Sequence, residues 1–471
     1  MTTTSRASGP ARDPHADAMT DPAAGDRVHG FFGHPRGLST LFFTEMWERF
    51  SYYGMRAFLI LYMVHALGFD DKHAGSVYGT YTASAWAAAI VGGIIADRWL
   101  GQYRSVLYGG IIIALGHFTL AFHPLPFFYA GLSLIVIGTG LLKPNVSGIV
   151  GSLYEPNDTR RDAGFSLFYM GINLGAFIGP LIAGYLAQKV DWHIGFACAG
   201  IGMTAGVVQY ILGRNRLQPA VERLERQRRE SHAAARERKL SVSGSAGPTE
   251  PTFWGFTKVE WKRLAAMGVF FVFAAVFWGA YEQAGSTLNL FGDRYSSTTI
   301  LGFTFPSSWF VSVQALFVIV LAPAFAWLWI KLGRLEPSTP TKFAIGLLFT
   351  GLSFLLLMIP ARHLQATPGI RVSPFWLIGC YFIQELGELS LSPVGLSVFT
   401  KLSPVKIVGL MLGVWFLADS VGNKVAGYAA GFISSAPLPD LFGTVAAVCL
   451  GASFIAFLMI KPVRSLMGGI H

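Results

Sequence analysis

The sequence contains few charged residues and very few cysteines. Lys, Arg, Asp and Glu make up 13% of its 471 residues, and there are 3 cysteines. A charged fraction this low would be odd for a soluble enzyme of this length. Cys198, Cys380 and Cys449 each stand in an apolar run, with no pairing pattern and no metal-ligand spacing. We therefore expect them to be packing residues.

Several functional motifs are also missing. There is no His-Glu-x-x-His, no Walker-type phosphate loop and no acid-metal spacing, which argues against a membrane-embedded enzyme and leaves no cofactor to expect. His65, His73 and His117 form no evident relay or metal site. Residues 1–36 lack the apolar core of a signal peptide, so we interpret them as a disordered cytoplasmic tail.

Apolar residues, in contrast, are abundant. The hydrophobic fraction is 52%, aromatic residues make up 14%, and there are 54 glycines. Runs of about 20 apolar residues are long enough to span a bilayer. Twelve such runs begin near Leu38, Val77, Ser105, Phe127, Gly164, Ile194, Leu264, Trp309, Phe343, Phe375, Val408 and Leu441. We expect an all-α membrane protein with both termini on one side, because twelve is even.

The basic residues predict which side that is. The loops alternate between a richer set (Arg98, Arg104, Arg160, Arg161, Lys331, Arg334, Lys342, Lys401, Lys406 and Lys461) and a poorer set (Lys72, Lys189, Arg294, Arg362 and Arg371). Cytoplasmic loops carry the excess of Lys and Arg, so we place the richer set and both termini in the cytoplasm. Topology thus accounts for the net charge of +10, and we expect no nucleic-acid partner.

The longest polar segment divides the chain into halves. Residues 214–260 begin with a charge-dense stretch of good helix formers and continue into a Ser-, Gly- and Pro-containing stretch. We interpret this segment as a cytoplasmic linker, with a regulatory binding segment as the alternative. It separates an N-terminal six-helix bundle, residues 37–213, from a C-terminal one, residues 261–465.

Two of the expected helices carry polar faces. At roughly 100° per residue, the first places Glu45, Glu48, Arg49, Tyr52 and Arg56 on one side. Each charge at mid-bilayer costs about 2.5–3.5 kcal/mol on insertion scales, so this face needs partners or a water-filled cavity. Such residues mark a transport or proton pathway by default.

The seventh expected helix repeats this arrangement. The same arithmetic places one set of side chains on a shared face: Trp278, Glu282, Gly285, Ser286 and Asn289.

Four stretches carry a family resemblance. Gly92 to Arg104 resembles the inner loop of the major facilitator superfamily, in which an Asp and an Arg, here Asp97 and Arg98, brace the cytoplasmic gate. Three further strings resemble the proton-dependent oligopeptide transporter family: Glu45-x-x-Glu48-Arg49-Phe50-x-Tyr52-Tyr53-Gly54, Phe168-Tyr169-x-x-Ile172-Asn173-x-Gly175, and Gly387-Glu388-x-x-x-Ser392-Pro393-x-Gly395-Leu396-Ser397. The resemblance covers well over four-fifths of the chain.

The resemblance implies a fold and an activity. The fold would be that of the major facilitator superfamily, with twelve transmembrane helices in two six-helix bundles. The activity would be proton-coupled import of di- and tripeptides by alternating access, with protons as the coupling ion and no cofactor. The family expectation is a monomer in contact with membrane lipid, and we place it in the inner (cytoplasmic) membrane of a bacterium.

The resemblance also implies roles for individual residues. Arg56 and Lys143 would bind the peptide carboxylate, and Glu388 and Asn173 its amine. A salt bridge from Glu282 to Arg56 would close the extracellular side until Glu282 is protonated. A second network of Glu45, Glu48, Arg49 and Lys143 would couple carboxylate binding to proton occupancy. The remaining substrate-binding candidates are Tyr52, Tyr53, Trp86, Trp278, Gln314, Ser392 and Trp415.

The chain departs from its relatives at a few positions. Gln314-Ala315 stands where relatives usually have Asn-Pro, which leaves the contact made there in doubt. Glu385 and Asp419 stand where relatives mostly carry neutral residues, and they could favour cationic peptides, alter proton stoichiometry or only form local hydrogen bonds.

Three alternatives stay open at this point. The chain could be a proton symporter of the same family for nitrate, an amino acid or another metabolite. It could also be a peptide receptor that does not transport. The buried charges, finally, could be a static ion-pair network.

Overall fold

The protein is almost entirely helical. The structure, a computed structural model, describes residues 30–155, 158–241, 255–404 and 407–468. Most of the predicted N-terminal tail and the second part of the predicted linker lie outside these residues. The N-terminal half contains α3 (Arg36–His65), α4 (Asp71–Ile95), the π-helical turn η1 (Ala96–Leu100), α5 (Gln102–Leu120), α6 (Leu125–Ser152), α7 (Arg161–Gly179), the π-helical turn η2 (Pro180–Gly184), α8 (Tyr185–Lys189) and α9 (Trp192–Leu212).

The C-terminal half follows the long helix α10 (Arg214–Ser241). It contains α11 (Lys258–Tyr281), the 3-10 segment η3 (Glu282–Gly285), α12 (Thr287–Arg294), η4 (Ser307–Trp309), α13 (Phe310–Leu332), η5 (Gly333–Leu335), α14 (Thr339–Ala366), α15 (Phe375–Leu402), α16 (Val408–Ala430), α17 (Leu438–Leu458) and α18 (Ile460–Leu466). A short antiparallel hairpin pairs β1 (Thr299–Ile300) with β2 (Phe303–Thr304).

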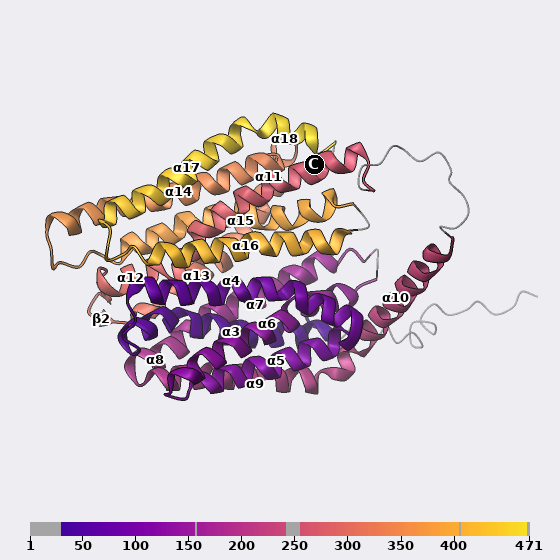
Figure 1. Cartoon of the computed structure of the whole chain (residues 1–471), viewed down its shortest axis with the longest axis horizontal. Helices are drawn as coiled ribbons and strands as arrows, with labels where there is room; N and C mark the ends of the chain where they lie inside the picture. Colours follow the sequence, from indigo (N-terminus) through magenta and orange to yellow (C-terminus); the bar gives the residue numbers. More distant parts are fainter. Residues whose placement is uncertain (1–29, 156–157, 242–254, 405–406, 469–471) are drawn as a thin grey trace, which may run out of the picture.

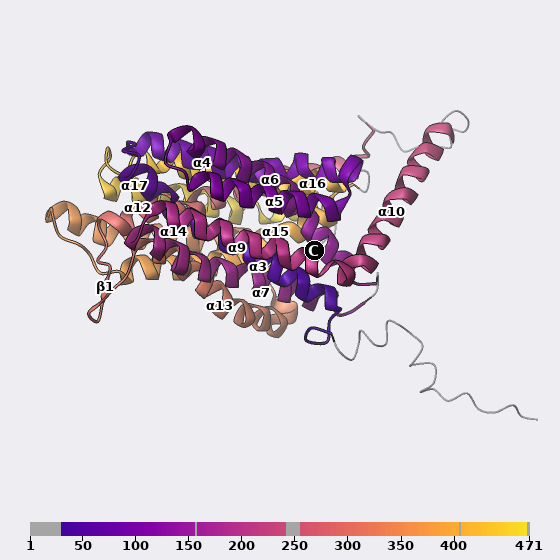
Figure 2. The same cartoon turned by 90° about the horizontal axis from the view of Figure 1, so that it is seen from below.

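The long helices run side by side along the length of the molecule, with the N-terminal half against the C-terminal half (Figures 1 and 2). We call the end that carries α10 the linker end and the end that carries β1 and β2 the hairpin end. Apart from α10, the described residues form twelve helices of at least 19 residues, consistent with the twelve predicted spans. Eight helical segments are long and apolar enough to cross a membrane. Of the other four long helices, α3, α15 and α16 carry buried charged side chains.

Local sequence accounts for several helix starts. The Asp70 side chain accepts the backbone N–H of His73 at 2.8 Å, which caps α4. Thr257 and Glu260 form a reciprocal capping box at the start of α11. These bonds satisfy amide groups that a helix N-terminus otherwise leaves without partners.

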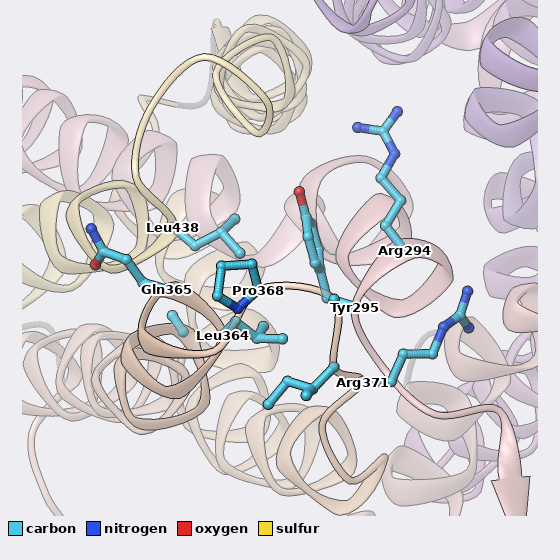
Figure 3. Close-up of a pocket in the computed structure, with 10 residues that line it drawn as sticks. Arg294, Tyr295, Leu364, Gln365, Pro368, Arg371 and Leu438 are labelled. Atoms are coloured by element: carbon cyan, nitrogen blue, oxygen red, sulfur yellow. The ribbon is translucent and has the colours of Figure 1, made fainter.

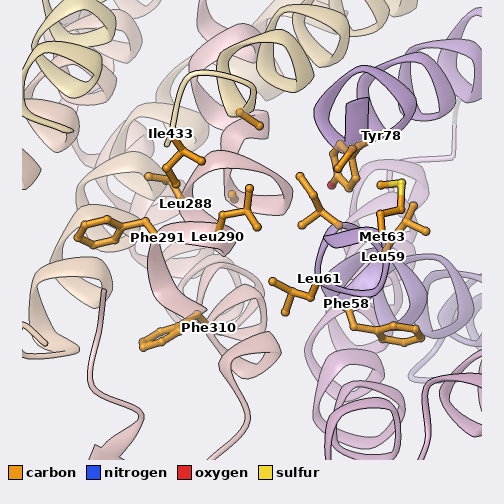
Figure 4. Packing of buried hydrophobic residues seen from close by; sticks show 14 of the residues in the cluster. Phe58, Leu59, Leu61, Met63, Tyr78, Leu288, Leu290, Phe291, Phe310 and Ile433 are labelled. Carbon is orange, nitrogen blue, oxygen red and sulfur yellow. The ribbon is translucent and has the colours of Figure 1, made fainter. Parts of the chain in front are cut away.

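The apolar cores differ between the two ends. At the hairpin end one continuous cluster contains Phe58 and Leu61 of the N-terminal half together with Leu288, Phe291 and other residues of the C-terminal half, as Figure 4 shows. At the linker end each half has its own cluster, one around Leu38 and Ile149 and the other around Ala266, Phe399 and their neighbours. The halves are therefore packed together at the hairpin end and have separate cores at the linker end.

Two helices approach each other closely at the hairpin end. A Cβ atom added to Gly427 of α16 would collide with backbone atoms of Gly75 and Gly79 in α4. Only glycine permits this contact, because it leaves room for the backbone of the other helix.

The first turns of α10 pack on the N-terminal half. Leu217 and Ala220 are buried in the same cluster as Leu38. The Arg223 guanidinium donates to the backbone oxygens of Ser152 and Tyr154 at 2.9 and 3.0 Å. The predicted linker therefore begins as a helix attached to the N-terminal half, and the helix then projects away from the bundle (Figure 2).

The seventh predicted helix is not continuous. The prediction that Trp278, Glu282, Gly285, Ser286 and Asn289 share one helical face is therefore wrong. α11 ends at Tyr281, the 3-10 segment follows, and α12 starts at Thr287. Residues on the two sides of this break cannot be placed on one face by a constant 100° step. Trp278 accordingly lies in the cluster around Ala266, whereas Asn289 donates to the backbone oxygen of Ala57 in the other half at 2.7 Å.

Candidate functional site

An ion pair joins the two halves at the centre of the molecule. Arg56 of α3 reaches across to Glu282, the first residue after α11, and both side chains are 6% exposed. The Arg56 Nε atom also donates to the Tyr78 hydroxyl of α4 at 2.5 Å. The predicted partners thus meet, and the guanidinium is held from both halves at once.

A second charged cluster lies about two to three turns earlier in α3. Arg49 forms ion pairs with Glu48 and with Glu45, the latter at 3.3 Å. All three residues are at most 3% exposed. Because Glu45 and Arg49 are four residues apart, the helix itself places them side by side.

Two tyrosines lie between these clusters. The rings of Tyr52 and Tyr53 meet edge to face at 5.2 Å. The guanidinium carbons of Arg49 and Arg56 lie between 5.1 and 5.9 Å from the two ring centroids. These distances are in the range of cation–π contacts, so aromatic faces partly replace water around both cations.

Lys143 of α6 has an aromatic partner. Its Nζ atom lies 2.8 Å from the ring centroid of Trp86, and this ring stacks on Phe416 of the C-terminal half at 5.8 Å. Glu45 and Glu48 are near enough to attract Lys143, but within the described residues no ion pair joins Lys143 to a carboxylate. Of the predicted four-residue network, three members pair directly and Lys143 stands apart.

Two further buried acids come from α15. Glu388 is 5% exposed, and the side chains of Ser392 and of Tyr169, from the other half, interact with its carboxylate. Glu385, one turn earlier, is fully buried and accepts a hydrogen bond from the Tyr281 hydroxyl at 2.8 Å. One oxygen of each carboxylate has no hydrogen-bond partner.

A small cavity of about 60 Å³ lies between the halves. Its lining includes the predicted residues Tyr53, Arg56, Asn173, Glu282 and Gln314, together with Tyr281. Gln314 donates to the side-chain oxygen of Gln384 at 3.1 Å, and Asn173 donates to the backbone oxygen of Tyr169 at 3.0 Å. The cavity therefore has a cationic wall from α3 and polar walls from α7 and α13.

Other predicted residues lie away from this cavity. Trp415 packs against Phe343 and Phe399, with ring centroids 6.5 and 5.3 Å apart, and Trp278 packs against Tyr281 at 5.4 Å. Asp97 and Arg98 are exposed in the π-helical turn at the linker end. Substrate contact by either tryptophan and the gate role of Asp97 and Arg98 stay predictions.

Asp419, which the sequence left open, is buried in α16. It accepts a hydrogen bond from Asn423 at 2.7 Å and lies near Lys143, Glu282 and Arg56. It therefore belongs to the charged interior between the halves.

Sequence reasoning did not assign a role to three tyrosines at the site. Tyr78, Tyr169 and Tyr281 each place a hydroxyl beside a buried charge. Tyr169 belongs to the motif that begins at Phe168, and Tyr281 directly precedes Glu282. These sequence positions do not indicate which neighbouring helix each side chain faces.

Polar contacts also close the hairpin end. Arg294 of α12 forms an ion pair with Asp71 of α4 at 2.6 Å. The His65 ring lies 2.8 Å from Asp293. Each contact joins the two halves, so the hairpin end is held by charge as well as by its apolar core.

A larger pocket of about 360 Å³ opens at the same end (Figure 3). Arg294, Tyr295, Arg371 and Leu438 are among its lining residues. The C-terminal half supplies the whole lining, and none of the lining residues is acidic. Because it has no group to bind an ammonium and does not lie between the halves, we do not take it as the substrate site. Among the residues that the structure describes, no group of three or more His, Cys, Asp or Glu side chains is placed to hold a metal ion.

Comparison with known proteins now identifies the family. A sequence model described as the POT family matches residues 103–222 and 227–448. The chain belongs to the POT family.

Relatives support this assignment along nearly the whole chain. It is 38% identical to the peptide transporter YePEPT of Yersinia enterocolitica, with 93% of this chain and 96% of that protein covered. It is also 38% identical to the di-/tripeptide transporter of Lactococcus lactis subsp. cremoris, covering 94% and 98%. A crystal structure of a POT peptide transporter in complex with sulfate shares 37% identity, with a TM-score of 0.83 over 98% of this chain and 100% of that chain.

Membership of the POT family fixes the broad class of the protein. It is a multi-pass membrane transporter with the fold of the major facilitator superfamily, and it is not an enzyme. The expected fold and family are confirmed.

Proposed function

We propose that this POT family member is a proton-coupled symporter that imports di- and tripeptides by alternating access. The observation that carries the proposal is the Arg56–Glu282 ion pair, which joins the two halves at the wall of a cavity that both halves line. An ion pair in this place opens or closes one side of the transporter when one of its members changes charge.

Peptides share an ammonium and a carboxylate, and both ends have candidate partners. Glu388 has an unpaired carboxylate oxygen, and the Tyr169 side chain contacts both Glu388 and Asn173, so Glu388 would take the ammonium. Lys143 has no carboxylate in direct contact among the described residues, and it would bind the peptide carboxylate. Arg56 would join Lys143 once Glu282 releases it. Recognition through the two ends leaves the peptide side chains free to vary.

Protonation of Glu282 supplies the driving step. While ionised, Glu282 holds Arg56 and keeps the hairpin end closed; once neutral, it loses most of its attraction for the guanidinium. One proton that crosses 100 mV releases about 2.3 kcal/mol. That energy allows roughly fifty-fold accumulation of a neutral solute, because each tenfold step needs about 1.4 kcal/mol.

The cluster of Glu45, Glu48 and Arg49 would link carboxylate binding to proton occupancy. Both acids share one arginine, and Lys143 is close enough to attract them. A peptide carboxylate bound at Lys143 cancels part of that attraction and so favours protonation of one of the acids.

The orientation of the protein in the membrane follows from the positive-inside rule. Three residues of the richer basic set, Arg98, Arg104 and Lys461, lie in segments at the linker end. Lys72 and Arg294, from the poorer set, lie in segments at the hairpin end. We therefore place the linker end and both termini in the cytoplasm of a bacterium. The protein would then be closed to the outside, and we propose that one chain works alone because a single chain forms the cavity.

The first experiment is uptake of labelled dialanine into proteoliposomes, with and without an inward proton gradient. Tripeptides, free alanine and nitrate serve as competitors. Gradient-driven accumulation that di- and tripeptides block, and that alanine and nitrate do not, is the expected result. Inhibition by nitrate or alanine instead would point to another solute. Peptide binding without flux, in vesicles that hold folded protein, would point to a receptor with a static ion-pair network.

A further inference from the structure

Glu385 is a buried carboxyl group that the proposed mechanism does not use. It is 0% exposed, its Oε1 atom accepts the Tyr281 hydroxyl at 2.8 Å, and its Oε2 atom has no partner. The titratable groups that face it are Tyr281 from α11, Tyr169 from α7 and Glu388 from its own helix. From α13, the Gln314 side chain donates to Gln384, the residue next to Glu385 in the chain.

The charges buried between the halves do not balance. Six carboxylates lie there, each at most 5% exposed: Glu45, Glu48, Glu282, Glu385, Glu388 and Asp419. The cations that accompany them in the described residues are Arg49, Arg56 and Lys143. An unpaired buried charge costs several kcal/mol, so three carboxyls need protons or cations from outside the chain.

Glu45 and Glu48 share Arg49, Glu282 has Arg56, and Asp419 lies near Lys143. The carboxyls in excess are therefore one of the Glu45–Glu48 pair, Glu385 and Glu388, and a peptide ammonium would balance Glu388. Neither Glu385 nor Glu388 lines the cavity between the halves, which Tyr281 borders, but Glu385 is 0% exposed whereas Glu388 is 5% exposed. A proton is the cation that fits a fully buried site of this kind.

Tyr281 connects Glu385 to the gate. It is the last residue of α11, and the 3-10 segment that follows begins with Glu282. A movement that separates Glu282 from Arg56 therefore moves the adjacent Tyr281 and with it the hydrogen bond to Glu385. Breaks in a membrane helix are natural points for such movement.

We propose that Glu385 is a second proton-carrying carboxyl of the transport cycle, linked to the Arg56–Glu282 gate through the Tyr281 hydroxyl. The inference rests on the proposed symport function. In the hairpin-open state the Glu385 carboxylate takes a proton from water on that side. In the linker-open state the same O–H bond breaks and the proton passes to water there. Each cycle then moves one more positive charge with the peptide.

The test is the charge-to-dialanine ratio of full-length protein in proteoliposomes, measured from the membrane potential at which net flux is zero. The variant is Glu385→Gln. Its amide oxygen can still accept a hydrogen bond from the Tyr281 hydroxyl, but the amide cannot take up and release a proton as a carboxyl does. The control is Asp440→Asn, which removes an exposed carboxyl from α17 in the same half. Exchange of labelled for unlabelled dialanine, which needs no net proton movement, shows that each variant is folded.

The expected result is a ratio lower by one charge in Glu385→Gln and unchanged in Asp440→Asn. At 100 mV this loss lowers the accumulation of dialanine by about fifty-fold. An unchanged ratio in Glu385→Gln overturns the proposal. A selective loss of affinity for lysine-containing peptides at an unchanged ratio also overturns it, and would make Glu385 part of a side-chain pocket.

Two further results are decisive. If wild-type protein exchanges dialanine but does not accumulate it under a gradient, the proposed symport fails and the role of Glu385 falls with it. If Glu385→Gln does not exchange dialanine, Tyr281→Phe replaces it as the test. This variant keeps the carboxyl and cuts its link to the gate, so we expect a proton leak without peptide. Wild-type behaviour of Tyr281→Phe then overturns the proposal.

Discussion

Arg56 makes two bonds with different consequences. Its Nε atom donates to Tyr78 within the N-terminal half, while its Nη2 atom reaches Glu282 in the other half. The first bond fixes the guanidinium on its own half whatever the gate does. Only the second bond depends on the charge of a group that can be protonated, so we expect the proposed gate to respond to protons at Glu282.

Glu282→Gln removes that charge and keeps the size of the side chain. We expect gradient-driven accumulation of dialanine to fall to the level seen without a gradient, because the gate no longer responds to protons. Exchange of dialanine at equal pH should persist. Uptake and exchange in the same proteoliposomes provide the measurement.

The control for this change is Asp162→Asn at the exposed start of α7. It should leave both activities unchanged. Full gradient-driven accumulation by Glu282→Gln would show that the ion pair is structural.

Glu388 is expected to bind the peptide ammonium. A hydrogen bond to a charged group contributes about 1.5–3 kcal/mol, so Glu388→Gln should weaken dialanine binding by about tenfold to a hundredfold. N-acetyl-dialanine has no ammonium and should bind both proteins alike. Competition against a labelled peptide measures both affinities, and an equal loss for the two compounds would exclude the assigned contact.

At the scale of elements, α4 and α16 join the two halves closely at the hairpin end. Gly427 leaves room for the backbone of Gly75 and Gly79, and the Ser420 hydroxyl donates to the backbone oxygen of Ala83 at 2.7 Å along the same contact. Glycine at such a crossing has no side chain, so the two helix backbones can approach closely, as in other helix pairs within membranes.

Gly427→Val should force these two helices apart. Overpacking of this kind costs about 1–3 kcal/mol, which shifts the equilibrium toward the hairpin-open state and slows uptake. Spin labels at the exposed positions 73 and 435, one in each half, should report a longer distance.

The matched control is Gly409→Val in the same helix, where an added Cβ meets nothing within 4 Å. It introduces the same β-branched residue into the first turn of that helix. If both variants lengthen the distance equally, the effect comes from helix propensity and the crossing is not responsible.

At the scale of the whole molecule, one end has a shared core and the other has separate cores. The central cavity should therefore be reached from the linker end. Val318→Cys, in a background without Cys198, Cys380 and Cys449, places a thiol in the cavity lining. A membrane-impermeant thiol reagent should modify it faster from the linker side of oriented vesicles.

Asp71→Asn should reduce the difference between labelling rates from the linker side and the hairpin side. It breaks the ion pair with Arg294 across the hairpin end, and a partly exposed pair of this kind contributes about 1 kcal/mol. Labelling from the hairpin side should then increase by about fivefold. Equal labelling from both sides of the unaltered protein would contradict the closed hairpin end.

Features that are local to one helix could be predicted from the sequence alone. Helix positions follow from apolar run length, and the Glu45–Arg49 pair follows from the four-residue spacing. The motifs of the first, fifth and tenth predicted helices led to the family, and through it to the Arg56–Glu282 pair. The polar face of the first helix could be recognised from the sequence alone. A charge in an apolar segment is costly wherever the helix lies, so such a face must turn away from lipid.

Which side chains meet between helices became known from the folded molecule. It placed Lys143 on Trp86 rather than on an acid, joined Tyr281 to Glu385, and broke the seventh helix at Glu282. These pairings depend on how each helix is rotated and shifted against its neighbours. Helical periodicity fixes the angle between residues of one helix, but it carries no information on the angle between two helices.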